Sequence, residues 1–288
     1  MLRGLYTAAS GMTTQQRRHD AITNNIANLN TPGFKGSNTV SRTFPDMLLS
    51  AMGGPEGTVK PIGKLSTGVF AEENLLSMIQ GDLQETYRNQ DIALVSDILV
   101  PGAVFDGSGK FVDGNGAITY QPQAYISILS PEGEERYTRN GSFRTASDGT
   151  LLTADGMRVL GTDGQPIRVN VSWDNVTVTA GGALVNSATG LPLDGEPQLR
   201  IMRVDNPNLL IREGDGRFRY EGDAAGIRQI TADDRVEVRQ GFLERSNVDT
   251  AQAAVDLMSA LRAYEANQRV IQFYDRSLDK AVNDIGRV

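Results

Sequence analysis

The first thirty residues carry apolar or small side chains at intervals that alternate between three and four residues. This spacing places them on one side of an α-helix and predicts a narrow heptad seam rather than a broad amphipathic face. Pro32 disfavours helix at the preceding residue and Gly33 permits a left-handed turn, so these residues mark the end of the helix. The seam positions are Leu5, Ala8, Met12, Gln15, His19, Ile22, Ile26 and Leu29.

The C-terminal segment repeats the same pattern over a longer span. Ser246 or Asn247 is expected to cap the start of this second helix, with Asp249 in its first turn. Polar residues within the seam weaken a coiled coil but fix its register and limit its partners. The seam positions are Ala254, Leu257, Leu261, Tyr264, Gln268, Ile271, Asp275, Leu278, Val282 and Ile285.

Gly4 and Gly11 lie seven residues apart on one side of the first predicted helix. Each costs about 1 kcal/mol relative to alanine in a helix interior. Two interpretations stay open at this point. The glycines are either tolerated near a frayed helix end, or they form a notch that lets another helix approach closely.

The middle of the chain, from about residue 117 to 239, follows a β pattern. Apolar and polar residues alternate over 124–128, and Asp-Gly turns at 148–149, 155–156 and 163–164 bound short runs in the manner of a meander. A compact antiparallel sheet or barrel is therefore expected here. Further strands are predicted at 176–179, 199–204, 217–220 and 236–238.

These segments together predict an α+β protein in which long N- and C-terminal helices pair as a coiled-coil-like domain, with a mainly antiparallel β domain inserted between them. Residues 50–68 and 101–116 are rich in glycine and proline and are interpreted as extended linker. The expected division is an N-terminal helix in 1–35, a connecting region in 36–85, a β domain in 86–239 and a C-terminal helix in 240–288.

Composition excludes several function classes. The net charge of −7 does not suggest a basic surface for nucleic acid, and no apolar run approaches the length of a membrane-spanning helix. The first residues do not resemble a secretory signal, because polar side chains interrupt any apolar stretch. The chain has no cysteine and one histidine, His19, so thiolate sites and multi-histidine metal sites are not possible.

No catalytic or metal site is predicted. Asp106 to Lys110 has a faint resemblance to a calcium loop, but it lacks the acidic ligands of such a loop and Lys110 would repel a cation. Asp148, Asp155 and Asp163 each precede a glycine, where tight turns favour aspartate for local hydrogen bonding. We therefore expect no cofactor, no metal and no enzyme activity.

Three groups of motifs resemble the signatures of bacterial flagellar rod and hook proteins. The N-terminal group is LYTAASGM at 5–12, NNIAN at 24–28 and NTPGFK at 30–35. The central group is YTRNGSF at 137–143 and GTLLTADG at 149–156. The C-terminal group is QGFLERSNV at 240–248 and RAYEANQ at 262–268.

The resemblance implies a structural subunit of the flagellar basal-body rod, of the distal or proximal class. It implies export through the flagellar type III apparatus and polymerisation through the terminal helices into an extracytoplasmic tube that transmits torque. The implied partners are copies of the chain and other flagellar axial proteins. The expected assembly residues are Leu5, Met12, Ile22, Asn24, Asn25, Ile26, Asn28, Phe34, Leu257, Leu261, Tyr264, Gln268, Ile271, Leu278 and Val282.

The passage from Ser96 to Gln123 departs from the family pattern, because it is longer and richer in glycine than the short strand usual there. A second interpretation, from another class, is a secreted carbohydrate-binding or glycan-processing β protein with helical ends for oligomerisation. The lack of a signal peptide and the single tryptophan, Trp173, count against it.

Overall fold

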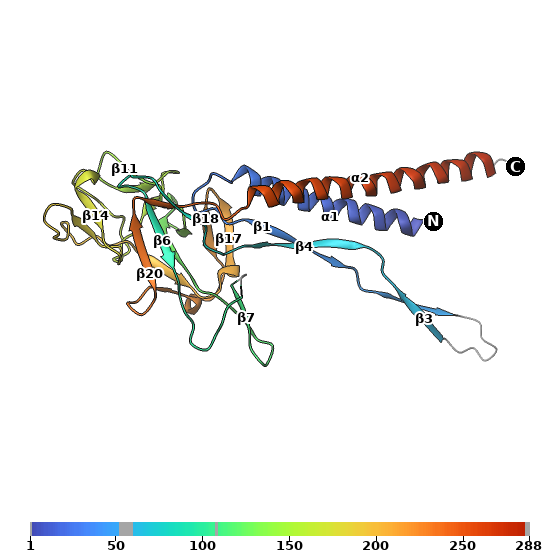
Figure 1. Ribbon diagram of the computed structural model, residues 1–288, viewed down its shortest axis with the longest axis horizontal. Helices are drawn as coiled ribbons and strands as arrows, with labels where there is room; N and C mark the ends of the chain where they lie inside the picture. The colour runs from blue at the N-terminus through green and yellow to red at the C-terminus, as the bar shows by residue number, and fades with distance from the viewer. Residues whose placement is uncertain (1, 52–59, 107–108, 286–288) are drawn as a thin grey trace. The chain divides into compact units, whose positions relative to one another are not determined.

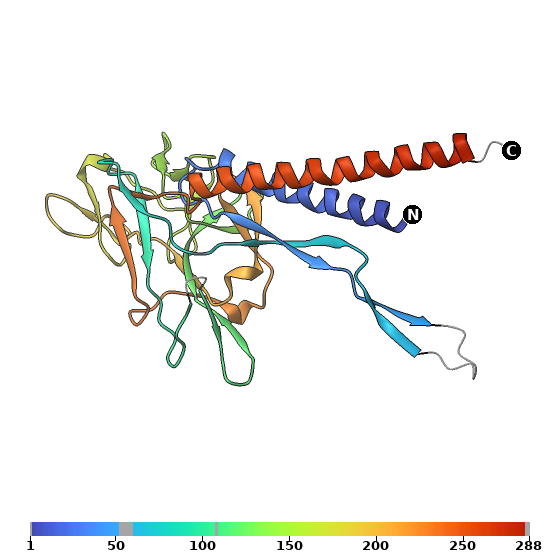
Figure 2. The same ribbon diagram turned by 45° about the vertical axis from the view of Figure 1, so that its right-hand side comes forward.

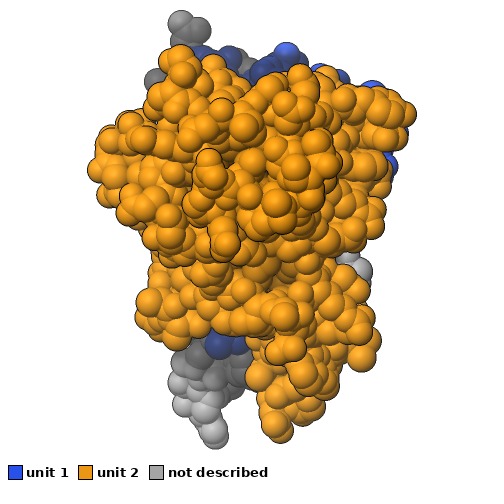
Figure 3. All heavy atoms as spheres, turned by 90° about the vertical axis from the view of Figure 1, so that its left-hand side faces the viewer, with its two compact units in different colours: residues 1–27, 37–75, 249–288 blue, residues 28–36, 76–248 orange. Residues whose placement is uncertain are grey.

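The computed structural model describes residues 2–51, 60–106 and 109–285. The chain divides into two compact units, which Figure 3 draws in different colours. Unit 1 comprises residues 1–27, 37–75 and 249–288, and unit 2 comprises residues 28–36 and 76–248. Unit 1 therefore contains both terminal helices, whereas unit 2 holds most of the strands.

Unit 1 is built on α1 (Leu2–Ala27) and α2 (Thr250–Lys280), which lie side by side in Figures 1 and 2. A short π-helical turn, η4 (Ala281–Ile285), follows α2. The unit also carries an arm of two antiparallel strand pairs. In the arm β1 (Ser37–Thr43) pairs with β4 (Val69–Leu76), and β2 (Met47–Ala51) pairs with β3 (Lys60–Leu65).

The expected linker at 50–68 is thus only partly correct. Strand β3 and the end of β2 lie within it, and residues 52–59 lie outside the described residues. Pro61 and Gly63 lie in β3 itself. Because both residue types are uncommon in strands, the sequence predicted a linker there. Isolated two-stranded sheets tolerate such residues, since one edge of each strand has no ladder partner.

The cap of α2 also differs from expectation. Asp249 is the cap, and its side chain accepts hydrogen bonds from the backbone N–H groups of Ala251 (2.8 Å) and Gln252 (3.1 Å). The Asn247 side chain is engaged elsewhere, where it accepts from Gly36 N and donates to Ser77 O. At the other helix, α1 ends at Ala27, so Leu29 lies outside it, and Gly33 has a left-handed φ of 68°.

The main sheet of unit 2 has nine strands. All of its pairs with a defined register are antiparallel, as expected for the inserted β region. The strands are β9 (Gln123–Leu129), β10 (Glu135–Thr138), β11 (Phe143–Thr145), β12 (Leu151–Thr153), β13 (Arg158–Val159), β16 (Ile201–Val204), β17 (Leu210–Gly214), β18 (Arg217–Tyr220) and β19 (Ile227–Gln229).

Over its described residues, unit 2 also contains four two-stranded antiparallel sheets. The passage after Ser96, which departs from the family pattern, contributes one of them as a short hairpin, with residues 107–108 outside the description. The pairs are β5 (Leu83–Glu85) with β21 (Phe242–Glu244), β6 (Ile92–Ser96) with β20 (Val236–Gln240), β7 (Lys110–Val112) with β8 (Ile118–Tyr120), and β14 (Val176–Val178) with β15 (Leu184–Asn186). The 3₁₀ turns are η1 (Trp173–Asn175), η2 (Pro207–Leu209) and η3 (Ala224–Gly226).

Strand β9 forms the centre of unit 2. Ala124, Ile126 and Ile128 enter one buried apolar cluster, and Tyr125 enters another. This is the alternation of a strand that is covered on both faces. The Asp-Gly turns behave as predicted, since Gly149 and Gly156 both have φ above 80° in the hairpins that flank β12.

Neither helix, over its described residues, is long and apolar enough to cross a membrane.

Candidate functional site

The expected assembly residues of α1, α2 and the turn η4 that follows α2 fall into three groups by exposure. Ile22 and Asn25 are buried, and Leu261, Gln268 and Val282 are exposed, as is Asn24. The remaining members on the two helices are half-buried, namely Leu5, Met12, Ile26, Leu257, Tyr264, Ile271 and Leu278. The sequence pattern did not distinguish side chains that pack inside the subunit from side chains that stay available to a partner.

The side of α2 that meets α1 is displaced by one residue from the expected seam. Ala253 and Ala260 are the buried residues of α2, and Asn267 and Tyr274 continue the same seven-residue series. Leu261, by contrast, is 42% exposed. The predicted seam followed Leu257, Leu261 and Ile271, so Ala253 and Ala260 fell one position outside it.

Gly4 and Gly11 form the notch that the sequence suggested. A Cβ atom at Gly4 would lie 2.1 Å from Tyr274 Oη, and one at Gly11 would lie 3.0 Å from Asn267 Nδ2. Both distances are shorter than an ordinary contact, so glycine at these positions lets the α2 side chains approach the α1 backbone.

A second, polar stripe on α1 holds the arm. Thr7 Oγ1 donates to Thr67 O (3.1 Å), Thr14 Oγ1 donates to Val69 O (3.4 Å), and Arg17 Nη1 donates to Ala71 O (3.2 Å). Ser10 Oγ accepts from Val69 N (3.4 Å). Intervals of three and four residues separate Thr7, Ser10, Thr14 and Arg17, so this stripe was detectable in the sequence beside the apolar seam.

Asn25 has a defined structural role at the base of the arm. Its side chain accepts a hydrogen bond from Ser37 N (2.9 Å) and donates one to Ser37 O (2.8 Å). Both residues are buried. The amide group therefore pairs with Ser37 as a neighbouring strand would, and satisfies two backbone groups that water does not reach.

Two other expected assembly residues lie in unit 2. Asn28 Oδ1 accepts a hydrogen bond from Thr31 Oγ1 within the turn that follows α1. Phe34 is buried, and the guanidinium of Arg212 lies 4.3 Å from the centre of its ring. The visible role of Phe34 is packing and a cation–π contact within the subunit.

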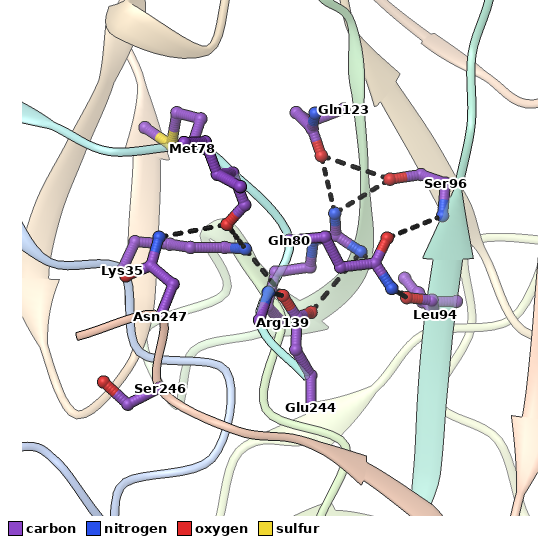
Figure 4. A network of polar contacts seen from close by, with 12 residues as sticks. Lys35, Met78, Gln80, Leu94, Ser96, Gln123, Arg139, Glu244, Ser246 and Asn247 are labelled. Atoms are coloured by element: carbon purple, nitrogen blue, oxygen red, sulfur yellow. Dashed lines mark hydrogen bonds and ion pairs between the residues drawn. The ribbon is translucent and has the colours of Figure 1, made fainter. Parts of the chain in front are cut away.

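The most unusual feature of unit 2 is a buried charge cluster of Lys35, Arg139 and Glu244, which Figure 4 shows pointing toward one another. Lys35 Nζ lies 2.6 Å from Glu244 Oε1, and Arg139 Nη1 lies 3.6 Å from Glu244 Oε2. The side chains of Lys35 and Arg139 are 0% exposed, and that of Glu244 is 1% exposed.

Neutral groups satisfy much of the remaining hydrogen-bonding capacity of the cluster. Lys35 Nζ also donates to Ile79 O (2.8 Å), and Gly81 N donates to Glu244 Oε1 (2.9 Å). Arg139 Nη2 donates to Ser96 Oγ (2.9 Å) and Gln123 Oε1 (2.7 Å). Such bonds are needed because a buried charge without partners is very unfavourable.

Burial and charge act in opposite directions on the ionisable groups of the cluster. Burial lowers the pKa of the Lys35 ammonium from 10.5 to about 8, because the attraction of Glu244 offsets only part of the lost hydration. Burial alone would raise the pKa of the Glu244 carboxyl, but Arg139 and Lys35 more than offset this and hold it below its ordinary value.

The sequence motifs did not indicate that these three residues form a cluster. Each of its three residues belongs to one of the three motif groups: Lys35 ends NTPGFK, Arg139 lies in YTRNGSF, and Glu244 lies in QGFLERSNV. Gly33 of the first motif also packs on the second, since a Cβ at Gly33 would lie 2.5 Å from the carbonyl carbon of Arg139. The only signal in the sequence was the presence of a charged residue in each motif.

The carboxylates that resembled catalytic or metal-binding groups serve local turns. Asp148 Oδ1 accepts from Thr150 N (3.0 Å), and Asp163 Oδ1 accepts from Gln165 N (3.0 Å). Asp106 Oδ1 accepts from Lys110 N (3.0 Å) in the same manner. Among the described residues, no group of three or more histidine or acidic side chains is arranged to hold a metal ion.

Three protein-family profiles match the chain. They are the flagellar basal body rod protein over residues 5–35, the D1 domain of the flagellar hook protein FlgE/F/G over residues 112–186, and the C-terminal region of the flagellar basal body rod FlgEFG proteins over residues 239–284. The first and third matches include most of α1 and α2, and the second includes the centre of the main sheet.

Curated proteins match over nearly the whole chain. The flagellar hook-basal body complex protein FlhO of Bacillus subtilis is 35% identical over 292 aligned residues, with 100% of both chains covered. The flagellar basal-body rod proteins FlgG of Borreliella burgdorferi and of Bacillus subtilis are 32% and 30% identical, and each covers 98% of this chain. The chain therefore belongs to the family of flagellar rod and hook-basal body proteins, the structural subunits of the flagellar basal body.

Proposed function

We propose that this chain polymerises through its terminal helices, α1 and α2, into the axial tube of the flagellar rod. The helices of each copy pair in a coiled-coil-like manner, and further copies and other axial proteins pack against them. In this proposal the chain is not an enzyme, and it transmits torque as part of the tube. It is exported through the flagellar type III apparatus before it assembles outside the cytoplasm.

The observation that carries the proposal is the exposed apolar surface of α2. We define this surface as Val255, Met258, Val270 and Phe273. Phe273 is 71% exposed, although it lies in the middle of the second half of a 31-residue helix. One helix partner, α1, covers the alanine-bearing side of α2 and leaves this surface in water. A second copy that covered this surface would gain a binding free energy of about 25 cal/mol for each Å² of apolar area that it buried.

The domain division expected from the sequence belongs to the same proposal. Residues 1–35 and 240–288 would supply the helical part of the tube, residues 36–85 the connection, and residues 86–239 the β part. The fifteen expected assembly residues stay predictions. Among them Leu261, Gln268 and Val282 have the exposure that a contact with a neighbouring copy requires.

The test is polymerisation of the purified full chain, followed by light scattering and electron microscopy. Phe273→Asp is expected to leave the unfolding midpoint of the monomer unchanged, because the side chain is exposed, and to abolish filaments by placing a charge in the interface. Gln272→Asp is the matched control, since it adds the same charge at an exposed polar neighbour. Normal filaments from Phe273→Asp would refute the proposal.

A further inference from the structure

Two segments of unit 2 continue directly into the terminal helices. The entry segment, residues 33–36, follows α1 after a short turn, and the return segment, residues 244–247, precedes α2. The two segments are hydrogen-bonded to each other. Gly33 N donates to Glu244 O (2.7 Å), and Gly36 N donates to Asn247 Oδ1 (2.7 Å). Unit 2 thus holds the entry and return segments together. We call these two segments the chain exits, because the chain passes through them between unit 2 and the terminal helices.

A third segment, residues 77–81, lies against both exits. Ser77 N donates to Gly36 O (2.7 Å), and Asn247 Nδ2 donates to Ser77 O (2.8 Å) and Ile79 O (3.0 Å). The charge cluster fastens this arrangement, because Glu244 Oε1 accepts both from Lys35 of the entry segment and from Gly81 N. The three segments are far apart in the sequence, so no two of them can form this structure locally.

The charges of the cluster do not balance. Lys35 and Arg139 are positive, Glu244 is negative, and all three are excluded from water. Without the Glu244 carboxylate, the fold would have to bury two positive charges close together with no counter-charge, or first release the proton of Lys35, and both are unfavourable at neutral pH. Placing Lys35 in the core of unit 2 therefore depends on the arrival of Glu244.

We propose that Glu244 is a folding lock for the two chain exits. The entry segment becomes ordered only when the return segment supplies the carboxylate, so both exits form in one step after the C-terminal part of the chain is present. The main sheet does not need this step. In an incomplete or partly folded chain, the entry segment therefore stays disordered until the return segment is in place.

Asp234 provides a matched control in the same unit. It is also a buried carboxylate between two positive groups, with Arg203 Nη1 at 2.7 Å and Arg228 Nη1 at 2.8 Å. It differs in position, because neither the entry nor the return segment takes part in this second cluster. Its arginines are also partly exposed, Arg203 by 17% and Arg228 by 41%. A general loss of stability would affect both variants alike, whereas the lock is specific to Glu244.

Hydrogen–deuterium exchange of the full-length chain tests the proposal. Glu244→Gln is expected to raise the exchange rate of the entry-segment amides, those of Gly33 and Gly36, at least tenfold, together with those of the return segment. The amides of β9 should stay protected. Asp234→Asn should raise exchange near Arg228 and leave the entry segment protected. An entry segment that remains protected in Glu244→Gln would overturn the lock.

A second variant keeps the test decisive if Glu244→Gln does not fold. Lys35→Met leaves a neutral Arg139–Glu244 pair and is expected to fold. In the Lys35→Met background, adding Glu244→Gln buries one unpaired positive charge instead of two, so the double variant is expected to fold even if Glu244→Gln alone does not. If both fold, the effect of Glu244→Gln on exchange should be at least tenfold smaller in the Lys35→Met background than in the natural chain. Equal effects in both backgrounds would overturn the proposal, as would failure of the double variant to fold.

Discussion

The environment of Lys35 depends on parts of unit 2 that are far away in the sequence. Its ammonium group has no contact with water, and its partners, Ile79 and Glu244, are 44 and 209 residues away along the chain. The cost of removing the charge from water exceeds the attraction of Glu244, so its pKa is lowered to about 8. The protonation state of Lys35 is therefore coupled to folding.

This coupling predicts a rise in stability at alkaline pH. Between pH 8 and 10.5 the unfolded chain holds a proton on Lys35 that the folded chain has released, so the free energy of unfolding increases with pH across that window. The full increase is on the order of 3 kcal/mol. Denaturant unfolding from pH 7.5 to 9.5 should show the rise in the natural chain and not in Lys35→Met. Identical pH profiles would contradict the buried position of Lys35.

Asn25 allows a second test at the scale of one residue. Asn25→Ala leaves the buried N–H and C=O groups of Ser37 without partners, and each such group costs about 1 to 3 kcal/mol. Equilibrium unfolding is expected to show a loss of at least about 2 kcal/mol. Thr23→Ala, at an exposed position two residues earlier, should change the free energy of unfolding by less than about 0.5 kcal/mol. A similar effect from both variants would mean that the contact with Ser37 is not formed.

At the scale of an element, α1 contacts both α2 and the arm, and it uses a different set of side chains for each. Its glycines receive side chains of α2, and its polar stripe of Thr7, Ser10, Thr14 and Arg17 binds the backbone of residues 67–71. Two glycines lower its intrinsic helix stability by about 2 kcal/mol in all. The order of α1 therefore depends on packing rather than on its own propensity.

Gly11 tests this dependence. Gly11→Leu improves helix propensity but places a side chain where Asn267 now lies, so it is expected to weaken the contact between the helices. Trypsin should cut faster after Arg17 and Arg18 in this variant. The second change Asn267→Ala makes room and should restore resistance, and Thr13→Leu, on the exposed side, should not increase cleavage. Unchanged resistance in Gly11→Leu would show that the glycine notch does not determine helix packing.

At the scale of the whole molecule, local patterns were predictable, and of the long-range contacts described here only the packing of α1 against α2 was. Both helices and the Asp-Gly hairpins follow from intervals and turn residues within a few positions of one another. The strands around residues 50 and 62 were missed, because Pro61 and Gly63 favour linker when no partner strand is known. The charge cluster was missed since Lys35, Arg139 and Glu244 are about one hundred residues apart, and periodicity carries no information at that separation.

The displaced seam of α2 has a related cause. A sequence pattern selects large apolar residues such as Leu261, whereas close helix packing is made by Ala253 and Ala260 against a partner that carries glycines. Leu261, and the surface of Val255, Met258, Val270 and Phe273, then remain exposed. Their exposure is what an assembling subunit requires and what a solitary domain would avoid.

Photo-cross-linking between copies is the most direct test of assembly through α2. The chain has no cysteine, so each variant carries a single thiol, to which a benzophenone maleimide is attached. Labelled Phe273→Cys is expected to give cross-linked dimers on illumination of assembled protein, and few in dilute monomer, whichever residue of the neighbouring copy it contacts. Ala260→Cys, on the side that meets α1, should give none in either state. Assembled Phe273→Cys protein that cross-links no more than the dilute monomer would contradict polymerisation through this surface.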